Sequence, residues 1–439
     1  MTATPPEATV IPSHLRAPQE VYEEIFSHLA KPSLSRCALV SHLWSISVRR
    51  TLFRAISIDE THPTYNLAGL LEGISSGQLD RIVSCVQELS LQGSKLGRFD
   101  AHASRRSISE YTKLSPEVVA GLLDDLPSLQ ILTLCHFHVT ELRTPPSLPP
   151  SYSLRRLKLI GITFFFPSWK YTYDLARLEK DLTREPCGLI DLLNLFTRID
   201  TLHLEDVDAS AGKELLEYKE DRRMALAEQI LQKRLSSLHI ETLETTTVWF
   251  FKQRVVMGFM SGLRTLKVVE IGDWSSEATF TAFLKAVGHS LVELRFKFAK
   301  GVPQFYRRDQ QLDLSTSMDL RIIRIFVDRA QLFVPNSVAP LIQSLFAKPP
   351  PCISEVYLHI FIPTGQETSR TLLGVQGMQW EAVDERLNNC GKLKKMEVSF
   401  RAEAPLLETE RAQLEALEQR LPLLQDRNLL HWEICERRA

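Results

Sequence analysis

The sequence predicts an α/β protein: a small helical unit followed by short parallel strands that alternate with helices in a curved, irregular solenoid. A short apolar pattern that ends in alternation, typical of a strand, recurs along most of the 439 residues. Helical apolar spacing precedes many of these strands and also fills residues 17–54. Hydrophobic content of 44% and charged content of 24% are typical of a globular chain. A three-layer α/β domain is the alternative fold.

The N-terminal unit is predicted from three stretches of helical spacing. These are Val21, Ile25 and Leu29 with Phe26 beside them; Leu34, Cys37, Ala38 and Ser41, with Leu39, Val40, Leu43 and Trp44 on another side; and Trp44, Val48 and Leu52. Pro32 separates the first two helices, because proline interrupts a helix but fits at the start of the next. So small a unit is near the limit of independent stability. We therefore expect its surplus apolar surface to be covered by the rest of the chain or by a partner protein.

The ordered residues of this unit resemble an F-box. They are Ala17-Pro18-Gln19-Glu20-Val21, Ile25-Phe26-Ser27-x-Leu29, Pro32-x-Leu34 and Leu39-Val40-Ser41-x-x-Trp44. Ala17 departs from the family, which usually has leucine before the proline. The resemblance implies docking on the Skp-type adaptor of a cullin–RING ubiquitin ligase. The implied adaptor-binding residues are Pro18, Val21, Ile25, Phe26, Leu29, Pro32, Leu34, Leu39, Val40 and Trp44.

The strand pattern is an apolar residue, two further residues, an apolar residue, one residue and an apolar residue. Four of its starts, at 235, 263, 291 and 320, are separated by 28, 28 and 29 residues. The predicted parallel strands are 86–91, 129–134, 154–159, 199–204, 235–240, 263–268, 291–296, 320–327, 354–360 and 394–400. Helical faces precede several of them, at 67–74, 119–126, 189–196, 280–287 and 380–387. Such pairs bury their apolar faces by stacking on their neighbours.

This array resembles the leucine-rich repeats that commonly follow an F-box. It lacks the buried Asn or Cys expected shortly after each strand. Those positions hold Phe137, Ile162, Val207, Leu243 and Ile271. We therefore expect irregular repeats, without a ladder of buried polar side chains.

Four segments follow from these patterns: a disordered tail (1–16), the F-box-like unit (17–54), the repeat array (55–404) and a C-terminal helix and cap (405–439). Residues 98–113 and 143–153 are expected to form exposed loops, and residues 213–234 an exposed charged helix. Leu407, Leu414, Leu417 and Leu421 are expected on one face of the last helix.

No motif predicts catalysis, and we expect neither a cofactor nor a metal site. The pair His136 and His138 lacks a third ligand. The aromatic residues Trp169 and Tyr171, and the separate Trp274, follow predicted strands and are candidates for target binding, although core packing is the alternative. Core packing in a repeat array would leave them buried.

The formal charge of −1 gives no basis for binding nucleic acid or an anionic membrane surface, and no apolar stretch is long enough to span a bilayer. The seven scattered cysteines and the absence of a secretory signal favour the cytoplasm or nucleus. The expected function is substrate recognition in ubiquitin-dependent protein degradation, with an unidentified target on the repeats. An interaction scaffold with no ligase role is the first alternative, and an enzyme of a misread fold is the second.

Overall fold

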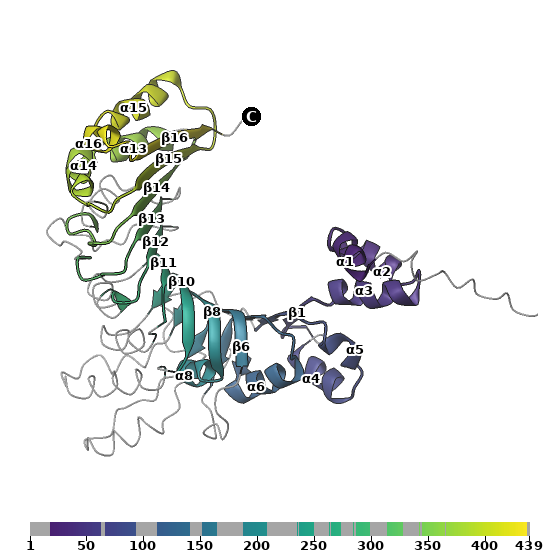
Figure 1. Ribbon diagram of the computed structural model, residues 1–439. Helices are drawn as coiled ribbons and strands as arrows, with labels where there is room; N and C mark the ends of the chain where they lie inside the picture. Colours follow the sequence, from purple (N-terminus) through teal and green to yellow (C-terminus); the bar gives the residue numbers. More distant parts are fainter. Residues whose placement is uncertain are drawn as a thin grey trace, which may run out of the picture. The chain divides into compact units, whose positions relative to one another are not determined.

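The computed structural model describes residues 18–62, 66–93, 112–140, 152–164, 188–208, 235, 237–249, 263, 265–273, 284, 287–298, 314–327, 342, 345–364 and 366–436. It is an α/β structure with a large parallel sheet and alternating helices (Figure 1). The chain divides into two compact units, Met1–Gln92 with Gly121–Leu132 and Gly93–Ala120 with Thr133–Ala439. The predicted α/β class is confirmed.

The first unit begins with three short helices, as expected: α1 (Gln19–Ser27), α2 (Lys31–Cys37) and α3 (His42–Leu52). Phe26, Leu34 and Val48 form their core, and each is at most 3% exposed. The partly buried residues packed against this core are Tyr22, Leu29, Cys37, Ala38, Trp44 and Leu52. One apolar residue from each helix therefore holds the three helices together.

The second helix is shorter than the sequence predicts. It ends at Cys37, and turns occupy residues 38–40. The hydroxyl of Ser41 accepts a hydrogen bond from the backbone N–H of Trp44 at 3.2 Å, which starts a new helix because it satisfies an amide of the first turn. Trp44 therefore lies in the first turn of α3 and not at the end of the second helix.

The first unit continues with β1 (Ala55–Asp59), α4 (Leu67–Ser75), α5 (Asp80–Val83) and β2 (Glu88–Gln92). Strands β1 and β2 pair in parallel, with Ala55 opposite Glu88. Helix α4 confirms the face predicted at 67–74. The sequence analysis missed β1 although Phe53, Ile56 and Ile58 match the strand pattern, because Phe53 was assigned to the helical unit.

The main sheet continues through strands that neighbour one another in chain order. They are β4 (Ile131–Cys135), β6 (Tyr152–Ile160), β8 (Phe196–Glu205), β10 (His239–Trp249), β11 (Val268–Asp273), β12 (Glu293–Phe298), β13 (Ile322–Val327), β14 (Glu355–Ile362), β15 (Lys395–Ala402) and β16 (Leu430–Glu436). Each adjacent pair from β6 to β16 is parallel. An antiparallel sandwich, which would have contradicted the predicted topology, is thus excluded for these strands.

Two rows of buried side chains run across this sheet, and each residue is paired with the next. The first row is Leu157, Leu202, Leu243, Val269, Leu294, Ile323, Val356 and Met396, and the second is Leu159, Leu204, Thr245, Ile271, Phe296, Ile325, Leu358 and Val398. Fully burying an aliphatic side chain contributes about 1.5–3 kcal/mol. These rows therefore form a continuous part of the apolar core described for the second unit.

Most strands start later than the sequence predicts. The first apolar residue of the pattern is buried but lies ahead of its strand in eight repeats: Val86, Leu129, Leu235, Leu263, Leu291, Leu320, Ile353 and Leu393. In two of these repeats the residue's carbonyl accepts a backbone hydrogen bond from three residues further on, from the N–H of Leu238 to Leu235 and from the N–H of Leu266 to Leu263. Apolar spacing predicts which residues are buried but not which residues form backbone hydrogen bonds to a neighbouring strand. The predicted strands therefore begin too early.

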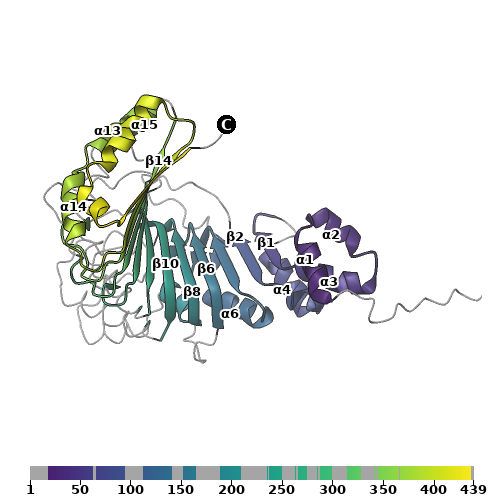
Figure 2. The same cartoon turned by 45° about the horizontal axis from the view of Figure 1, so that its top comes forward.

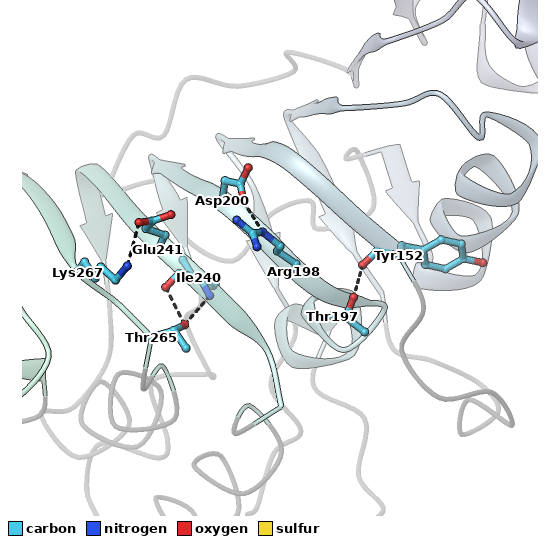
Figure 3. A network of polar contacts seen from close by, with 8 residues as sticks. All are labelled: Tyr152, Thr197, Arg198, Asp200, Ile240, Glu241, Thr265 and Lys267. Atoms are coloured by element: carbon cyan, nitrogen blue, oxygen red, sulfur yellow. Dashed lines mark hydrogen bonds and ion pairs between the residues drawn. The ribbon is translucent and has the colours of Figure 1, made fainter.

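Polar contacts join the starts of neighbouring strands (Figure 3). The hydroxyl of Thr197 donates to the carbonyl of Tyr152 at 3.1 Å. The hydroxyl of Thr265 accepts from the N–H of Ile240 at 2.9 Å and donates to its carbonyl at 3.0 Å. Two ion pairs lie nearby, Arg198 with Asp200 and Lys267 with Glu241. Side chains thus provide backbone partners where the ladder between strands begins.

A second, smaller row of strands follows the main one: β3 (Thr112–Leu114), β5 (Phe137–Val139), β7 (Thr163–Phe164) and β9 (Val207–Asp208). Positive φ angles at His136, Gly161 and Asp206 turn the chain between the two rows. A Cβ at Gly161 would lie 2.3 Å from Nδ1 of His136, so only glycine fits there. The residues after these turns, Phe137, Ile162 and Val207, are fully buried. Apolar packing therefore occupies the positions where the repeat family has Asn or Cys.

The helices of the second unit include α8 (Gly188–Leu193), α13 (Gln366–Gln376), α14 (Trp380–Asn388), α15 (Glu408–Glu418) and α16 (Pro422–Asp426). Figure 2 shows α13, α14 and α15 beside the last strands. Trp380 of α14 packs edge-on against Trp432 of β16, which is paired with Val398 of the second buried row. These helices therefore cover the apolar side of the sheet.

Several expectations need correction at the edges of elements. Helix α6 (Pro116–Asp125) covers most of the face predicted at 119–126, but α8 ends at Leu193 and Phe196 already belongs to β8. Leu407 is exposed, unlike Leu414, Leu417 and Leu421, because it precedes the first turn of α15. The C-terminal segment also contains the unpredicted strand β16.

Parts of the predicted loops are strands. Residues 112 and 113 belong to β3, and residues 152 and 153 belong to β6. The remainder of those loops, the predicted helix at 213–234 and most of the predicted helix at 280–287 lie outside the described residues.

Candidate functional site

The N-terminal helices expose an unusual amount of apolar side chain. Val21, Ile25, Leu39, Val40, Leu43 and Ile46, which we call the apolar patch residues, are between 40% and 87% exposed. Val21 and Ile25 lie one turn apart on α1, and the others lie in the turn after α2 or in α3. Exposed single apolar residues are common, but six within 26 positions of a small unit are typical of an interaction surface.

The predicted adaptor-binding residues divide into surface and core positions. Val21, Ile25, Leu39 and Val40 are exposed, and so are Pro18 and Pro32. Pro18 precedes α1, and its carbonyl accepts a hydrogen bond from the N–H of Val21 at 3.1 Å. Pro32 lies in the first turn of α2. The two prolines therefore occupy helix starts, as expected.

Four other predicted adaptor-binding residues support the unit from within. Phe26 and Leu34 are buried, and Leu29 and Trp44 pack against them. The ring of Phe26 is 5.5 Å from that of Trp44 and 6.3 Å from that of Tyr22. Phe26 was expected on the docking surface, but its side chain faces the core. These four residues can therefore affect an interface mainly by shaping the helices.

Leu43 and Ile46 were not predicted as adaptor-binding residues. Leu43 lies in the first turn of α3 and Ile46 in the next, and both are on the exposed side of this helix. Their apolar character was visible in the sequence. The boundary between the second and third helices was needed to interpret it.

The predicted target-binding residues Trp169, Tyr171 and Trp274 lie outside the described residues. Their exposure remains a prediction. Among the residues that the structure describes, no group of three or more His, Cys, Asp or Glu side chains could hold a metal ion. His138 is buried, and this burial lowers its pKa, with a further contribution from Lys113.

The side of the sheet opposite the two buried rows is polar. The residues of this polar face include Arg156, Lys158, His203, Glu205, Glu244, Glu270, Glu293, Arg295, Lys297, Arg324, Phe326, Glu355, Tyr357, His359, Lys395 and Glu397. They alternate with the apolar residues along each strand, because successive side chains of a strand point to opposite faces. Most are partly exposed.

At one end of the polar face, His203 lies between two carboxylates. Its Nδ1 is 3.1 Å from Glu244 and its Nε2 is 3.3 Å from Glu205. The hydrogen bond with Glu244 is the main reason that the pKa of His203 is raised, and the same bond lowers the pKa of Glu244. Arg156 adds a contact of 3.7 Å to Glu244. The charges here are largely balanced within the protein.

Further along the polar face, Glu293 holds two arginines. Burial alone would raise the pKa of Glu293, but hydrogen bonds from Arg295 and Arg324 leave it lowered. The guanidinium of Arg324 lies 4.0 Å from the centre of the Tyr357 ring, and the amine of Lys395 lies 5.1 Å from it. Tyr357 donates a hydrogen bond to Glu355 at 2.6 Å, which is the main cause of its raised pKa.

Aromatic rings adjoin these charges. Phe326 stacks on His359 with ring centres 4.9 Å apart, and Tyr357 lies 6.1 Å from His359. Nδ1 of His359 is 2.6 Å from the hydroxyl of Ser399. This group was not predicted, because the strand pattern uses only the apolar positions that face the core. Aromatic residues at the outward positions of EVYLHIFI and IIRIFV were the available signal.

Comparison with protein-family models found no match for this chain, and comparison with curated proteins found none either. Within the described ranges, no helix has both the length and the apolar character needed to cross a membrane.

Proposed function

We propose that this protein is the substrate-recognition subunit of a Skp–cullin–F-box type E3 ubiquitin ligase. The F-box-like unit would bind the adaptor through the apolar patch residues, and the leucine-rich-repeat-like solenoid would bind a target protein. The observation that carries the proposal is the exposure of Val21, Ile25, Leu39 and Val40 on helices whose order of residues resembles an F-box. The expected site of action is the cytoplasm or nucleus.

The helical unit leaves much of its apolar surface uncovered. Its buried core contains only Phe26, Leu34 and Val48, whereas twice as many large apolar side chains face solvent. Removing apolar surface from water contributes about 25 cal/mol per Å². A partner that covers the apolar patch residues would therefore gain free energy without any change in the core.

The proposed mechanism is proximity. Binding the adaptor at one end of the chain and a target on the repeats raises the effective concentration of the target near the ubiquitin-loaded enzyme. No catalytic side chain of this chain is required. The chemistry belongs to the other ligase subunits.

Adaptor binding tests the proposal directly. We expect the purified chain to bind a Skp-type adaptor, and Val40→Glu to weaken binding about thirtyfold or more by placing a charge at an apolar contact. Leu373→Glu is the matched control, because Leu373 is 66% exposed in α13, outside the helical unit. Circular dichroism and thermal melts of the same samples would establish that the variants fold.

Two results would contradict the proposal. One is no adaptor binding by the wild type at micromolar concentration, in which case the chain is better described as a leucine-rich-repeat-like interaction scaffold with no ligase role. The other is equal binding by Val40→Glu and Leu373→Glu, since the adaptor contact would then lie elsewhere.

A further inference from the structure

The polar face contains a pair of arginines that share one carboxylate. Nε of Arg295 and Nε of Arg324 each donate to the same oxygen of Glu293, both at 2.7 Å. Two positive charges thus meet one negative charge. The neighbouring Lys297 has its own partner, Glu270, at 3.8 Å. Within this contact, the arginine pair therefore carries one positive charge that Glu293 does not balance.

The geometry leaves the arginines suited to a further anion. A guanidinium has five N–H donors, and the bond to Glu293 uses one donor of each arginine. The side chains of Arg295 and Arg324 are 32% and 28% exposed, whereas that of Glu293 is 12% exposed. The carboxylate lies beneath, and the guanidinium groups reach solvent. Glu293 also fixes their positions, which lowers the entropy lost when an anion binds.

Aromatic surface lies directly beside the arginine pair. In the strand register Arg324 is opposite Tyr357, and Phe326 is opposite His359. Burial lowers the pKa of His359, and its ring stacks on that of Phe326, so the two rings present adjoining aromatic surface. Tyrosine and arginine are enriched among the residues that dominate protein interfaces.

We propose that this part of the polar face, formed by Arg295, Arg324, Phe326, Tyr357 and His359, binds an acidic segment of a target protein. A carboxylate or phosphate of that segment would contact the arginine pair, and a neighbouring apolar side chain would pack on Phe326 and His359. This inference depends on the proposed function only for the role of the bound protein as a ligase target.

Charge complementarity favours a protein segment over nucleic acid. A nucleic acid gains its affinity from several phosphate contacts along a basic track. Here Glu270, Glu293, Glu355 and Glu397 are interspersed among the cations, and the whole chain has a formal charge of −1. A single acidic group matches the one positive charge that Glu293 leaves unbalanced in the arginine pair, and an apolar group beside it matches the rings of Phe326 and His359.

Selection from a displayed library of random short peptides, with the full-length chain as bait, tests the inference. We expect the selected peptides to contain Asp or Glu beside an aromatic or aliphatic residue. Arg324→Gln should weaken a selected peptide about ten- to hundredfold, the usual value of a hydrogen bond to a charged group. Replacing the peptide's acid by phosphoserine or by glutamine distinguishes a preference for phosphate from one for carboxylate.

Control variants separate this surface from the rest of the protein. Lys158→Gln removes a positive charge from the same face on β6 and should leave peptide affinity unchanged. Tyr357→Ala, which removes the ring beneath Arg324 without changing charge, should weaken binding, provided that its thermal melt matches the wild type.

The inference would be overturned if no peptides were selected, or if the selected peptides were not enriched in acidic residues. It would also be overturned if Arg324→Gln and the wild type bound a selected peptide with equal affinity. Displacement of the peptide by a single-stranded oligonucleotide at physiological salt would overturn it as well. The adaptor is absent from this experiment. A chain that fails to bind adaptor but selects acidic peptides would refute the ligase proposal and leave the surface intact, and the converse result would do the opposite.

Discussion

Replacing Phe26 by alanine should unfold the N-terminal helices, although the equivalent change at Ile25 should not. Phe26 is 1% exposed and contacts the rings of Trp44 and Tyr22, whereas Ile25 is 51% exposed. Truncating a buried phenylalanine costs about 3–5 kcal/mol. A surface substitution usually changes stability by less than about 0.5 kcal/mol.

The size of the unit makes this difference decisive. At about 0.05–0.15 kcal/mol per residue, the residues from Pro18 to Phe53 contribute roughly 2–5 kcal/mol of stability. Loss of the Phe26 ring is therefore comparable with the whole stability of the three helices. Ile25→Ala should leave the helices folded but remove part of the apolar patch.

Amide hydrogen exchange measured by mass spectrometry reports this directly. Peptides from residues 18–53 should lose protection in Phe26→Ala, while peptides from β13 to β15 keep theirs. In Ile25→Ala both groups should stay protected, and adaptor binding alone should weaken. Wild-type protection of residues 18–53 in Phe26→Ala would refute the assignment of this residue to the core.

Two further predictions concern the second unit. Gly161→Ala should lower the melting temperature, because the φ of Gly161 is +60° and an added Cβ would lie 2.3 Å from His136. The control Gly374→Ala adds a carbon with no atom within 4 Å and should be tolerated or slightly stabilising. Equal melting temperatures for the two variants would contradict the requirement for glycine at position 161. His203 has a raised pKa, so the contribution of its charged form is present below the unfolded pKa and is lost as pH rises through the folded pKa. The wild type should therefore lose more stability than His203→Gln between about pH 6 and about pH 8, and parallel melts of the two proteins would contradict this.

The sequence was sufficient for the elements with strong apolar spacing. Each of the ten predicted strands overlaps a strand in the structure, although 235–240 shares only two residues with β10 and 263–268 only one with β11. The helices around Leu70, Leu122 and Val383 lie where expected. Alternating burial along a strand appears in the sequence as alternating apolar and polar residues. The start of a strand is not visible in this way, because the leading residue of each repeat, such as Leu263, can be buried from a turn as well as from a strand.

Short elements escaped prediction for a related reason. Strands β5, β7 and β9 have two or three residues, and the one or two residues that separate each from the preceding strand include one with positive φ. Glycine is the residue that most clearly predicts a turn with positive φ, but two of these three turns have His136 and Asp206 at that position. In strand β16, Trp432 packs against the rings of Phe400 and Trp380, which are distant in sequence, so local spacing could not predict this strand.

The sequence by itself determined which residues are apolar and how often they recur, and this was enough for the α/β class, the three N-terminal helices and the resemblance to an F-box. Tertiary structure decided which of those residues are covered. Phe26 and Val40 are both apolar members of the resemblance, yet one is buried and the other is exposed. The arginine pair at Glu293 likewise depends on strand register, which brings Arg295 and Arg324 together from neighbouring strands. Local spacing encodes a face, whereas a site requires knowledge of what packs against that face.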